Sequence, residues 1–165
     1  MGTETREKLQ DLIGGFRDAM LVTRDAGGTL QGRPMHVAAH DETSGTLTFA
    51  SSVATEKVEE VRAGHDACVT FQDGTTYVSL SGECSVTQDR ARIREVWDKA
   101  MEVWFPDGPE QADLCLIVFR PAFGEYWDQS GAEGLRLLWK TATAYVRDES
   151  PDVGSDGELH GETTL

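Results

Sequence analysis

The spacing of apolar positions changes several times along this 165-residue chain, and each change predicts a different element. Apolar residues at helical spacing predict a first helix over 5–16, where Leu9, Ile13 and Phe16 form one stripe. The same spacing predicts further helices over 53–63, 89–105 and 135–147. Alternation or short apolar runs predict strands over 19–23, 29–40, 47–49, 67–71, 77–87, 114–119 and 123–127.

The turns between these strands favour hairpins over crossover connections. Gly27-Gly28, Ser44-Gly45 and Asp73-Gly74 each separate two predicted strands by a few residues. Because strands and helices do not alternate regularly, we expect a mainly antiparallel sheet of six or seven strands, either a barrel or an α+β fold. We expect one domain over 1–147, followed by an acidic tail over 148–165 with six acids and no Lys or Arg, which predicts mobility.

Composition and charge exclude several classes of partner. A net charge of −14 argues against general affinity for nucleic acid or anionic membrane. No apolar run reaches about 18 residues, and the N-terminus is too polar for a secretory signal, so we expect a cytoplasmic location by default. The three cysteines form no C-x-x-C pair, and the four histidines show no ligand spacing with them, which predicts buried thiols and no metal site.

One stretch combines basic residues with hydroxyl side chains at a strand end. Arg33-Pro34-Met35 lies in the second predicted strand, where the proline removes a ladder donor and indicates an edge or a bulge. Ser51 and Ser52 end the third strand, and Thr55 and Lys57 open the next helix. A helix start offers free amides, and Arg33 and Lys57 supply charge for a phosphate dianion. The alternative is a plain helix cap beside a solvated lysine.

Five short motifs in a fixed order resemble those of a known family. They are Arg33-Pro34-Met35 after a Gly-Gly hairpin, Phe49-x-Ser51-Ser52 with Thr55-x-Lys57-Val58-x-Glu60-Val61, Thr76 to Gly82 (TYVSLSG), Trp104-Phe105-Pro106-x-Gly108-Pro109, and Glu125-Tyr126-Trp127-Asp128. Over about residues 8–130 the chain resembles the general stress protein 26 family of pyridoxamine 5′-phosphate oxidase-like flavoproteins. The resemblance implies an antiparallel split β-barrel with flanking helices that binds FMN, or FAD or another flavin, in clefts of a homodimer.

The same resemblance implies positions for the flavin. Arg33, Pro34 and Met35 would run beside the ring and ribityl chain, and Tyr77 and Ser79 would reach the flavin from the partner subunit. Trp104 and Trp127 are candidates for packing near the ring, with core packing as the alternative. The residues expected around the phosphate are Ser51, Ser52, Thr55 and Lys57.

Two departures from the better-known oxidases narrow the expected activity. Glu56 stands where those enzymes have a basic residue, which is expected to weaken phosphate binding unless Glu56 points to solvent. The chain also lacks their C-terminal Arg/His cluster for pyridoxine phosphate, since Arg136 stands in a different context, so true pyridoxamine phosphate oxidase activity is not expected.

We therefore expect an FMN-dependent oxidoreductase or flavin reductase, with a small-molecule redox partner and no catalytic side chain identified. The alternatives are a non-catalytic flavin-storage or sensing protein, the same barrel with deazaflavin, and the same barrel with haem bound by His36 or His40. An interaction module without a cofactor is a further alternative.

Overall fold

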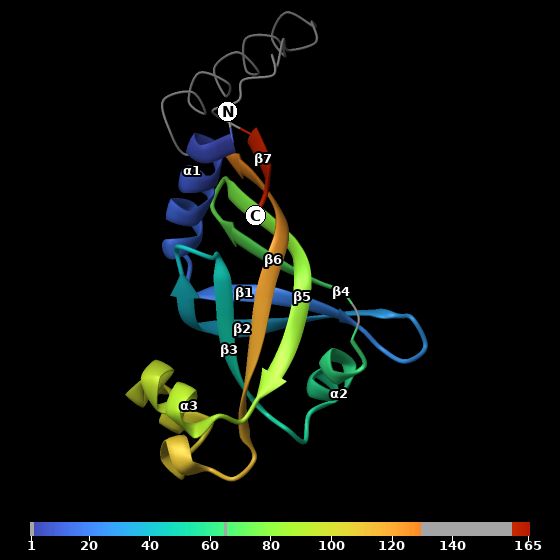
Figure 1. Cartoon of the computed structure of the whole chain (residues 1–165), viewed down its shortest axis with the longest axis vertical. Helices are drawn as coiled ribbons and strands as arrows, with labels where there is room; N and C mark the ends of the chain where they lie inside the picture. The colour runs from blue at the N-terminus through green and yellow to red at the C-terminus, as the bar shows by residue number, and fades with distance from the viewer. Residues whose placement is uncertain (1, 65, 130–159) are drawn as a thin grey trace, which may run out of the picture.

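A computed structural model describes residues 2–64, 66–129 and 160–165 (Figure 1). Its helices are α1 (Gly2–Gly14), α2 (Glu56–Arg62), α3 (Arg90–Val96) and two short 3-10 helices, η1 (Lys99–Val103) and η2 (Gly108–Glu110). Its strands are β1 (Asp18–Arg24), β2 (Leu30–Asp41), β3 (Thr46–Ser52), β4 (Asp66–Asp73), β5 (Thr76–Thr87), β6 (Leu114–Asp128) and β7 (His160–Thr164).

Six of the strands close into an antiparallel barrel, and the seventh extends it. The strand order is β3-β2-β1-β4-β5-β6-β7, and pairing of β3 with β6 joins the two ends of the six-stranded part. Figure 1 shows α2 and α3 on opposite sides of one end of the barrel, with α1 and β7 at the other end. The expected mainly β fold, an antiparallel split barrel with flanking helices, is confirmed.

Strand β6 is buried on both faces along its first half, because it separates two hydrophobic clusters. Cys115, Ile117 and Phe119 point into the barrel core, which α1 covers with Leu9 and Ile13. The intervening side chains face the other way and pack with Ile93, Met101 and Phe105 of the α3–η1 segment; they are Leu114, Leu116 and Val118. Because alternate side chains of β6 face two different hydrophobic clusters, successive residues of this strand are apolar.

The predicted break at Pro121 is wrong, because β6 runs unbroken from Leu114 to Asp128. The register shifts between Ser81 and Gly82, which pair with Phe123 and Pro121 respectively, so Ala122 is an extra residue. A bulge of this kind bends the strand and accommodates a residue without a backbone donor. Pro34 also behaves as expected, since β2 pairs with β3 only from Val37 onward and is an edge at Pro34.

The single helix predicted over 89–105 is also wrong. Helix α3 ends at Val96, and Trp97 is extended (φ −65°, ψ 126°). Asp98 then caps η1, accepting a hydrogen bond from the Ala100 amide at 2.8 Å. An aspartate that bonds nearby amides competes with a continuing helix. The interruption rotates the apolar stripe, which buries Met101 and leaves Trp104 78% exposed.

Two further boundaries differ from the sequence predictions. Helix α2 begins at Glu56 instead of residue 53, because the Val53 amide bonds to the Asp113 carbonyl at 2.8 Å and the Ala54 amide to Ser52 Oγ at 3.2 Å. Residues 160–164, expected in a mobile tail, form β7 on β6. The predicted helix over 135–147 and tail residues 148–159 lie outside the described residues. No helix in the described part is long and apolar enough to cross a membrane.

Candidate functional site

Arg33, Ser51, Thr55 and Lys57 come together at one end of the barrel, and we call them the cationic cluster. Ser51 is the next-to-last residue of β3, and its buried Oγ lies 3.2 Å from Thr55 Oγ1 in the turn before α2. The Thr55 hydroxyl also bonds to the Ser52 carbonyl at 2.9 Å, which fixes the turn. Lys57 follows in the first turn of α2, within electrostatic range of Arg33 on β2. The structure therefore brings together four of the residues predicted from sequence.

Lys57 is a half-buried cation beside a second cation. Burial lowers the pKa of its ammonium, and the nearby Arg33 guanidinium lowers it further. Among the described residues no carboxylate lies within ion-pair distance of Lys57. Glu60 acts on Lys57 only from beyond ion-pair distance, and a half-buried charge without a direct counter-ion is costly. An anion between Lys57 and Arg33 relieves that cost, and a phosphate is the chemistry these donors suit.

Glu60 of α2 holds Arg33 in place, a role that the sequence motif containing Glu60 did not predict. Its two carboxylate oxygens accept from Arg33 Nη1 at 2.8 Å and from Nη2 at 3.0 Å. The Thr23 hydroxyl donates to the same carboxylate and accepts from Arg33 Nη1 at 2.6 Å. The hydrogen bonds from Arg33 lower the pKa of Glu60, which keeps it ionised. Glu60 is 8% exposed and lies beside buried Val61 in α2. This position next to an apolar residue was the sequence signal that Glu60 is buried.

Ser52 differs from the other phosphate-binding candidates, and Glu56 is the acid expected to weaken phosphate binding. The Ser52 hydroxyl donates to Asp113 at 2.6 Å, and Asp113 also accepts from Gln111 at 2.8 Å. The bond from Ser52 lowers the pKa of Asp113, so this carboxylate stays ionised. Ser52 is therefore oriented toward an acid, whereas Glu56 is exposed on the surface of α2. The exposure of Glu56 agrees with the hypothesis that it points to solvent.

The remaining residues on β2 present different groups to the site. Pro34 is exposed, but Met35 is buried in the barrel core. Because its side chain packs inward, Met35 offers only its backbone to a ligand outside the barrel. The expected run beside a flavin ring is thus limited to Pro34, the Arg33 side chain and the strand backbone.

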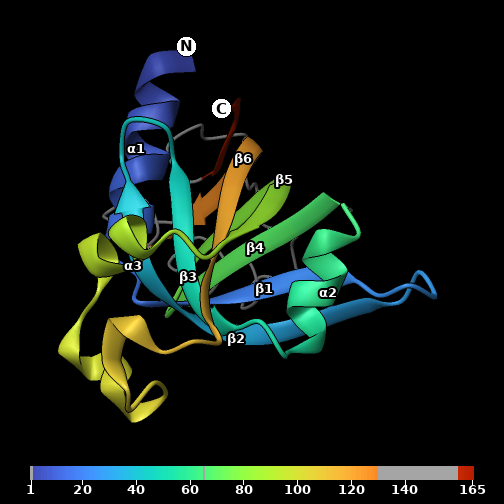
Figure 2. The same cartoon turned by 60° about the horizontal axis from the view of Figure 1, so that its bottom comes forward.

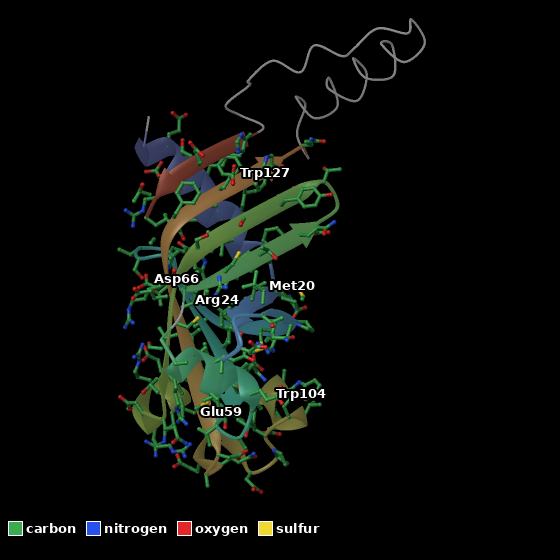
Figure 3. The ribbon with its side chains drawn as sticks, turned by 90° about the vertical axis from the view of Figure 1, so that its right-hand side faces the viewer. Met20, Arg24, Glu59, Asp66, Trp104 and Trp127 are labelled. Atoms are coloured by element: carbon green, nitrogen blue, oxygen red, sulfur yellow. The ribbon has the colours of Figure 1, made fainter. Side chains whose placement is uncertain are left out.

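Tyr77, Ser79 and Trp127 lie away from the cationic cluster within one chain, whereas Trp104 lies at the α2 end. Thr87, at the end of β5, pairs with Leu116 of β6. The adjacent residue of β6, Cys115, pairs with Ser51, so this end of β5 is near the cationic cluster. At about 3.3 Å per residue, Tyr77 is roughly 30 Å along β5 from Thr87. Ser79 and Trp127 belong to the same distant half of β5 and β6. Figure 3 shows Trp127 at one end and Trp104, with Glu59 of α2, toward the other.

Trp127 is covered on one face by the C-terminal strand. Its ring stacks on His160 with centroids 5.1 Å apart and planes at 7°. His160 Nε2 also bonds to Glu125 Oε1 at 2.7 Å. One face of Trp127 is therefore occupied by this chain.

The two histidines proposed as haem ligands have other partners. His36 Nδ1 lies 3.0 Å from Asp18 Oδ1. His40 Nε2 bonds to Gln10 Oε1 at 2.7 Å, and burial lowers the pKa of His40. Within the described ranges no group of His, Cys, Asp or Glu is arranged to hold a metal ion.

Comparisons with known proteins agree with this fold. The chain is 28% identical over 134 residues to protein bli-3 of Neurospora crassa, and the match covers 73% of the chain and 64% of that protein. The chain thus spans about two thirds of the length of this curated relative. A structure described as general stress protein 26 from Jannaschia sp. CCS1 is 27% identical, with a TM-score of 0.73 and full coverage of both chains.

A more distant structure has the same fold and a more specific description. The general stress FMN/FAD binding protein of Xanthomonas citri is 20% identical, has a TM-score of 0.68, and is matched over 78% of this chain and 92% of its own. A family model described as pyridoxamine 5′-phosphate oxidase like matches residues 4–152, most of the sequence. The chain therefore belongs to the pyridoxamine 5′-phosphate oxidase-like family, as its motifs predicted.

Proposed function

We propose that this protein binds flavin mononucleotide and holds its phosphate at the cationic cluster. The observation that carries the proposal is the half-buried Lys57 ammonium, which lies beside Arg33 and has no carboxylate partner in the described part of the chain. The Xanthomonas citri protein, described as FMN/FAD binding, and a Nostoc punctiforme protein described as FMN binding have the same fold, which supports a flavin. FAD or another flavin is the alternative ligand.

The side chains of the cluster contribute different interactions with the phosphate. Lys57 and Arg33 supply positive charge, and Glu60 keeps the Arg33 guanidinium in one orientation. The Ser51 and Thr55 hydroxyls supply neutral hydrogen bonds beside them. Because α2 has only seven residues, we assign the anion to these side chains and give its dipole a minor role.

The chain's own residues offer no separate acid, base or nucleophile in the cluster. Glu60 is ionised through its lowered pKa and fully engaged with Arg33 and Thr23. Burial raises the pKa of the Cys115 thiol to about 11, so it is neutral and a poor nucleophile at neutral pH. A bound flavin supplies electron-transfer chemistry that such side chains lack. We therefore favour an FMN-dependent oxidoreductase or flavin reductase of unknown substrate.

The same lack of acid–base groups favours a second candidate, a non-catalytic flavin store or sensor. Reduction of the bound flavin by NADH or NADPH, followed by many turnovers to an added acceptor, is expected for the enzyme. A single stoichiometric reduction, or none, would support the store. Pyridoxamine 5′-phosphate is not a proposed substrate, because the chain lacks the C-terminal Arg/His cluster that binds it.

We expect replacement of Lys57 by alanine to weaken FMN binding by about 1.5–3 kcal/mol, the scale of a hydrogen bond to a charged group. Fluorescence titration of the apoprotein with FMN measures the change. The matched control is Arg62→Ala, which removes the same charge from the exposed last turn of α2. Equal affinity of the wild-type protein and Lys57→Ala would refute the phosphate assignment, whatever the flavin does afterwards.

The distance between Tyr77 and the cationic cluster favours a homodimer with the flavin between its subunits. One chain cannot present both to one flavin, because Tyr77 lies at the opposite end of β5 from Thr87, which is the end near the cluster. A second copy supplies Tyr77 and Ser79 to the cluster of the first, with Trp127 contributing its uncovered face. The flavin then lies between two subunits of a homodimer.

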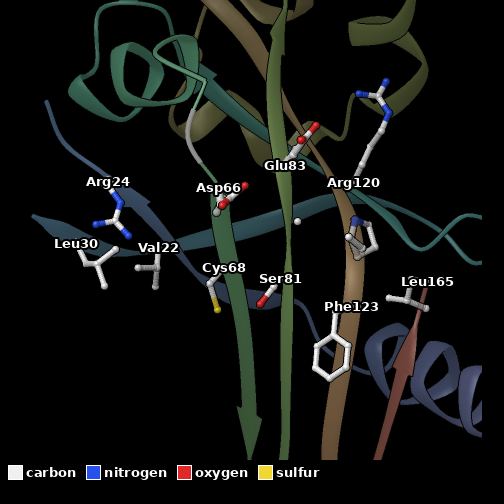
Figure 4. Close-up of a pocket in the computed structure, with 14 residues that line it drawn as sticks. Val22, Arg24, Leu30, Asp66, Cys68, Ser81, Glu83, Arg120, Phe123 and Leu165 are labelled. Carbon is white, nitrogen blue, oxygen red and sulfur yellow. The ribbon is translucent and has the colours of Figure 1, made fainter. Parts of the chain in front are cut away.

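An open groove on the barrel suits this contact between copies (Figure 4). It has a volume of about 660 Å³, and Val22, Leu30 and Phe123 make its apolar part. Leu30 is 61% exposed and Phe123 is 37% exposed, so the groove presents apolar side chains to solvent. The groove is lined by residues of β1, β2, β4, β5 and β6, so it includes β5, the strand that carries Tyr77 and Ser79.

The charges of the groove are self-complementary. Figure 4 shows Arg24 and Arg120 on either side of the acids Asp66 and Glu83. None of these four forms an ion pair with another described residue. Two copies that each carry a net charge of −14 repel one another, so their contact needs a locally balanced patch. In a two-fold dimer Arg24 of one copy meets Asp66 or Glu83 of the other.

Reversing the charge of Arg24 is expected to weaken the dimer. In Arg24→Glu the new acid faces Asp66 or Glu83 of the second copy, and the dissociation constant should rise about tenfold or more, because like charges at an interface are costly. Sedimentation equilibrium measures the change, and adding Asp66→Lys should restore part of the affinity. Lys99→Glu, an equal charge change on exposed η1, is the control. If Arg24→Glu and Lys99→Glu behave alike, the groove is not the dimer contact.

A further inference from the structure

A second groove lies on the opposite face of β3 from Ser51. Its volume is about 290 Å³, near the lower end for small-molecule sites. Along β3, Leu47, Phe49 and Ser51 are on the core side, whereas Thr48 faces the α3 side of the strand with its partner Val118. The groove is therefore separate from the cationic cluster. It is lined by the end of β2, by β3, by α3 and by the outer face of β6.

Thr48 places an unpaired polar group in this groove. The residue is only 7% exposed, and its hydroxyl forms no hydrogen bond with any residue that the structure describes. Thr48 Oγ1 is not itself buried, since the buried side-chain polar atom without a partner in the described residues is Gln10 Nε2, so the hydroxyl is accessible to a molecule in the groove. Its neighbours in the groove are the apolar side chains of Leu116 and Val118. The groove thus combines an apolar floor with one hydrogen-bond donor.

Two arginines line the same groove without carboxylate partners among the described residues. Arg92 is exposed on α3 and makes no side-chain hydrogen bond there. Arg120 of β6 donates only to Ser85 Oγ, at a long 3.4 Å. By contrast, the neighbouring Arg94 points elsewhere and pairs with Glu110 at 2.6 Å. Two unpaired guanidinium groups at one groove are notable in a chain of net charge −14.

The other ionisable residues of the groove do not neutralise both arginines. The Asp41 carboxylate accepts from the Thr43 amide and from the Ser44 hydroxyl, both at 2.9 Å, and belongs to the β2–β3 turn. Burial lowers the pKa of His40, so its ring adds no charge at neutral pH. Glu95 is exposed on α3 and is the one free acid of the described lining.

We propose that this groove binds a small organic carboxylate. Its acid group lies between Arg92 and Arg120, whose guanidinium donors match a carboxylate in geometry. Its short apolar body rests on Leu116 and Val118, and the Thr48 hydroxyl donates to an oxygen of the same ligand. The site does not depend on the proposed flavin, because it lies on the other face of β3.

Isothermal titration calorimetry with the full chain as purified tests the proposal. The probes are straight and branched carboxylates of two to eight carbons, among them 4-methylpentanoate, with 4-methylpentanamide as the uncharged match. We expect binding of at least one carboxylate and none of its amide. Arg92→Gln should weaken that binding about tenfold, since a hydrogen bond between charged groups is lost. Thr48→Val, which keeps the shape of the side chain, should weaken it severalfold.

Two variants on the same helix separate the proposed site from a general effect on α3. Glu95→Gln should tighten carboxylate binding, because it removes the free acid from the groove. Arg94→Gln should leave binding unchanged, because Arg94 does not line the groove. The proposal is overturned if no carboxylate in the series binds, if the amide binds as well as the acid, or if Arg92→Gln and Arg94→Gln give equal affinities. Arg92 is exposed, so its substitution tests the site without disturbing the core.

Discussion

Replacing Glu60 with alanine is expected to lower the free energy of unfolding by about 3–5 kcal/mol, the scale of breaking a buried ion pair. The change leaves the Arg33 guanidinium without the two bonds of 2.8 and 3.0 Å that now neutralise it. It also leaves Lys57 and Arg33 as two adjacent cations with no acid between them. Urea denaturation at neutral pH measures the loss, and added phosphate or FMN should restore part of it.

The pH dependence of the free energy of unfolding provides a second test of the Arg33–Glu60 ion pair. The pKa of Glu60 is lowered in the folded protein from an ordinary 4.5, so its contribution is fully present above that value. It is lost as the pH falls through the lower folded pKa, where Glu60 becomes protonated. The stability gap between wild type and Glu60→Gln should therefore narrow in acid.

Controls on the same helix and on Arg33 isolate the buried charge. Glu59→Ala removes an exposed acid from α2 and should change stability by less than about 0.5 kcal/mol. The double variant Arg33→Met/Glu60→Leu should be more stable than Glu60→Ala alone, because it removes both charges together. If Glu60→Ala is no less stable than Glu59→Ala, Glu60 does not anchor Arg33.

The alternation of apolar residues was enough to predict the strands, because one face of most strands is buried. The pattern over 77–87, for example, reappears as β5 with Val78 and Leu80 in the core. Closure of the barrel was a different matter. Leu47 and Phe119 pair across 72 residues, and nothing in a local pattern names the partner of a strand. The resemblance supplied the barrel that periodicity left open.

The candidate site also contains residues that a local sequence pattern can suggest and residues that depend on long-range contacts. Lys57, Ser51 and Thr55 lie within seven residues of one another, so a local motif could suggest them, and the family resemblance favoured a phosphate site over a plain helix cap. The Arg33–Glu60 pair joins β2 to α2 across 27 residues and emerged only in three dimensions. Trp104 was placed on a helical stripe that Asp98 interrupts, and its exposure followed from that cap. Long-range contacts and local caps were the two kinds of information that spacing lacked.

Replacing Gly82 with alanine is expected to destabilise the barrel by about 3 kcal/mol, the upper end for overpacking in a core. A Cβ at this position would meet backbone on β6, coming within 2.8 Å of Pro121 Cα and 2.9 Å of the Arg120 carbonyl carbon, with the Arg120 oxygen closer still. Backbone cannot rotate away as a side chain can. The two strands must separate at the bulge between Ser81 and Gly82, which thermal or urea unfolding will detect.

Gly32→Ala is the matched control in another strand. Its Cβ would meet only side-chain atoms, Met20 Cε at 3.5 Å and Val22 Cγ2 at 3.7 Å, which is ordinary van der Waals contact. We expect a change within about 1 kcal/mol, because alanine also restricts the unfolded chain. If Gly82→Ala is tolerated equally well, β5 and β6 do not approach so closely at the bulge. Because Gly82 and Pro121 line the 660 Å³ groove, such a result would also change the surface on which we expect the second copy to dock.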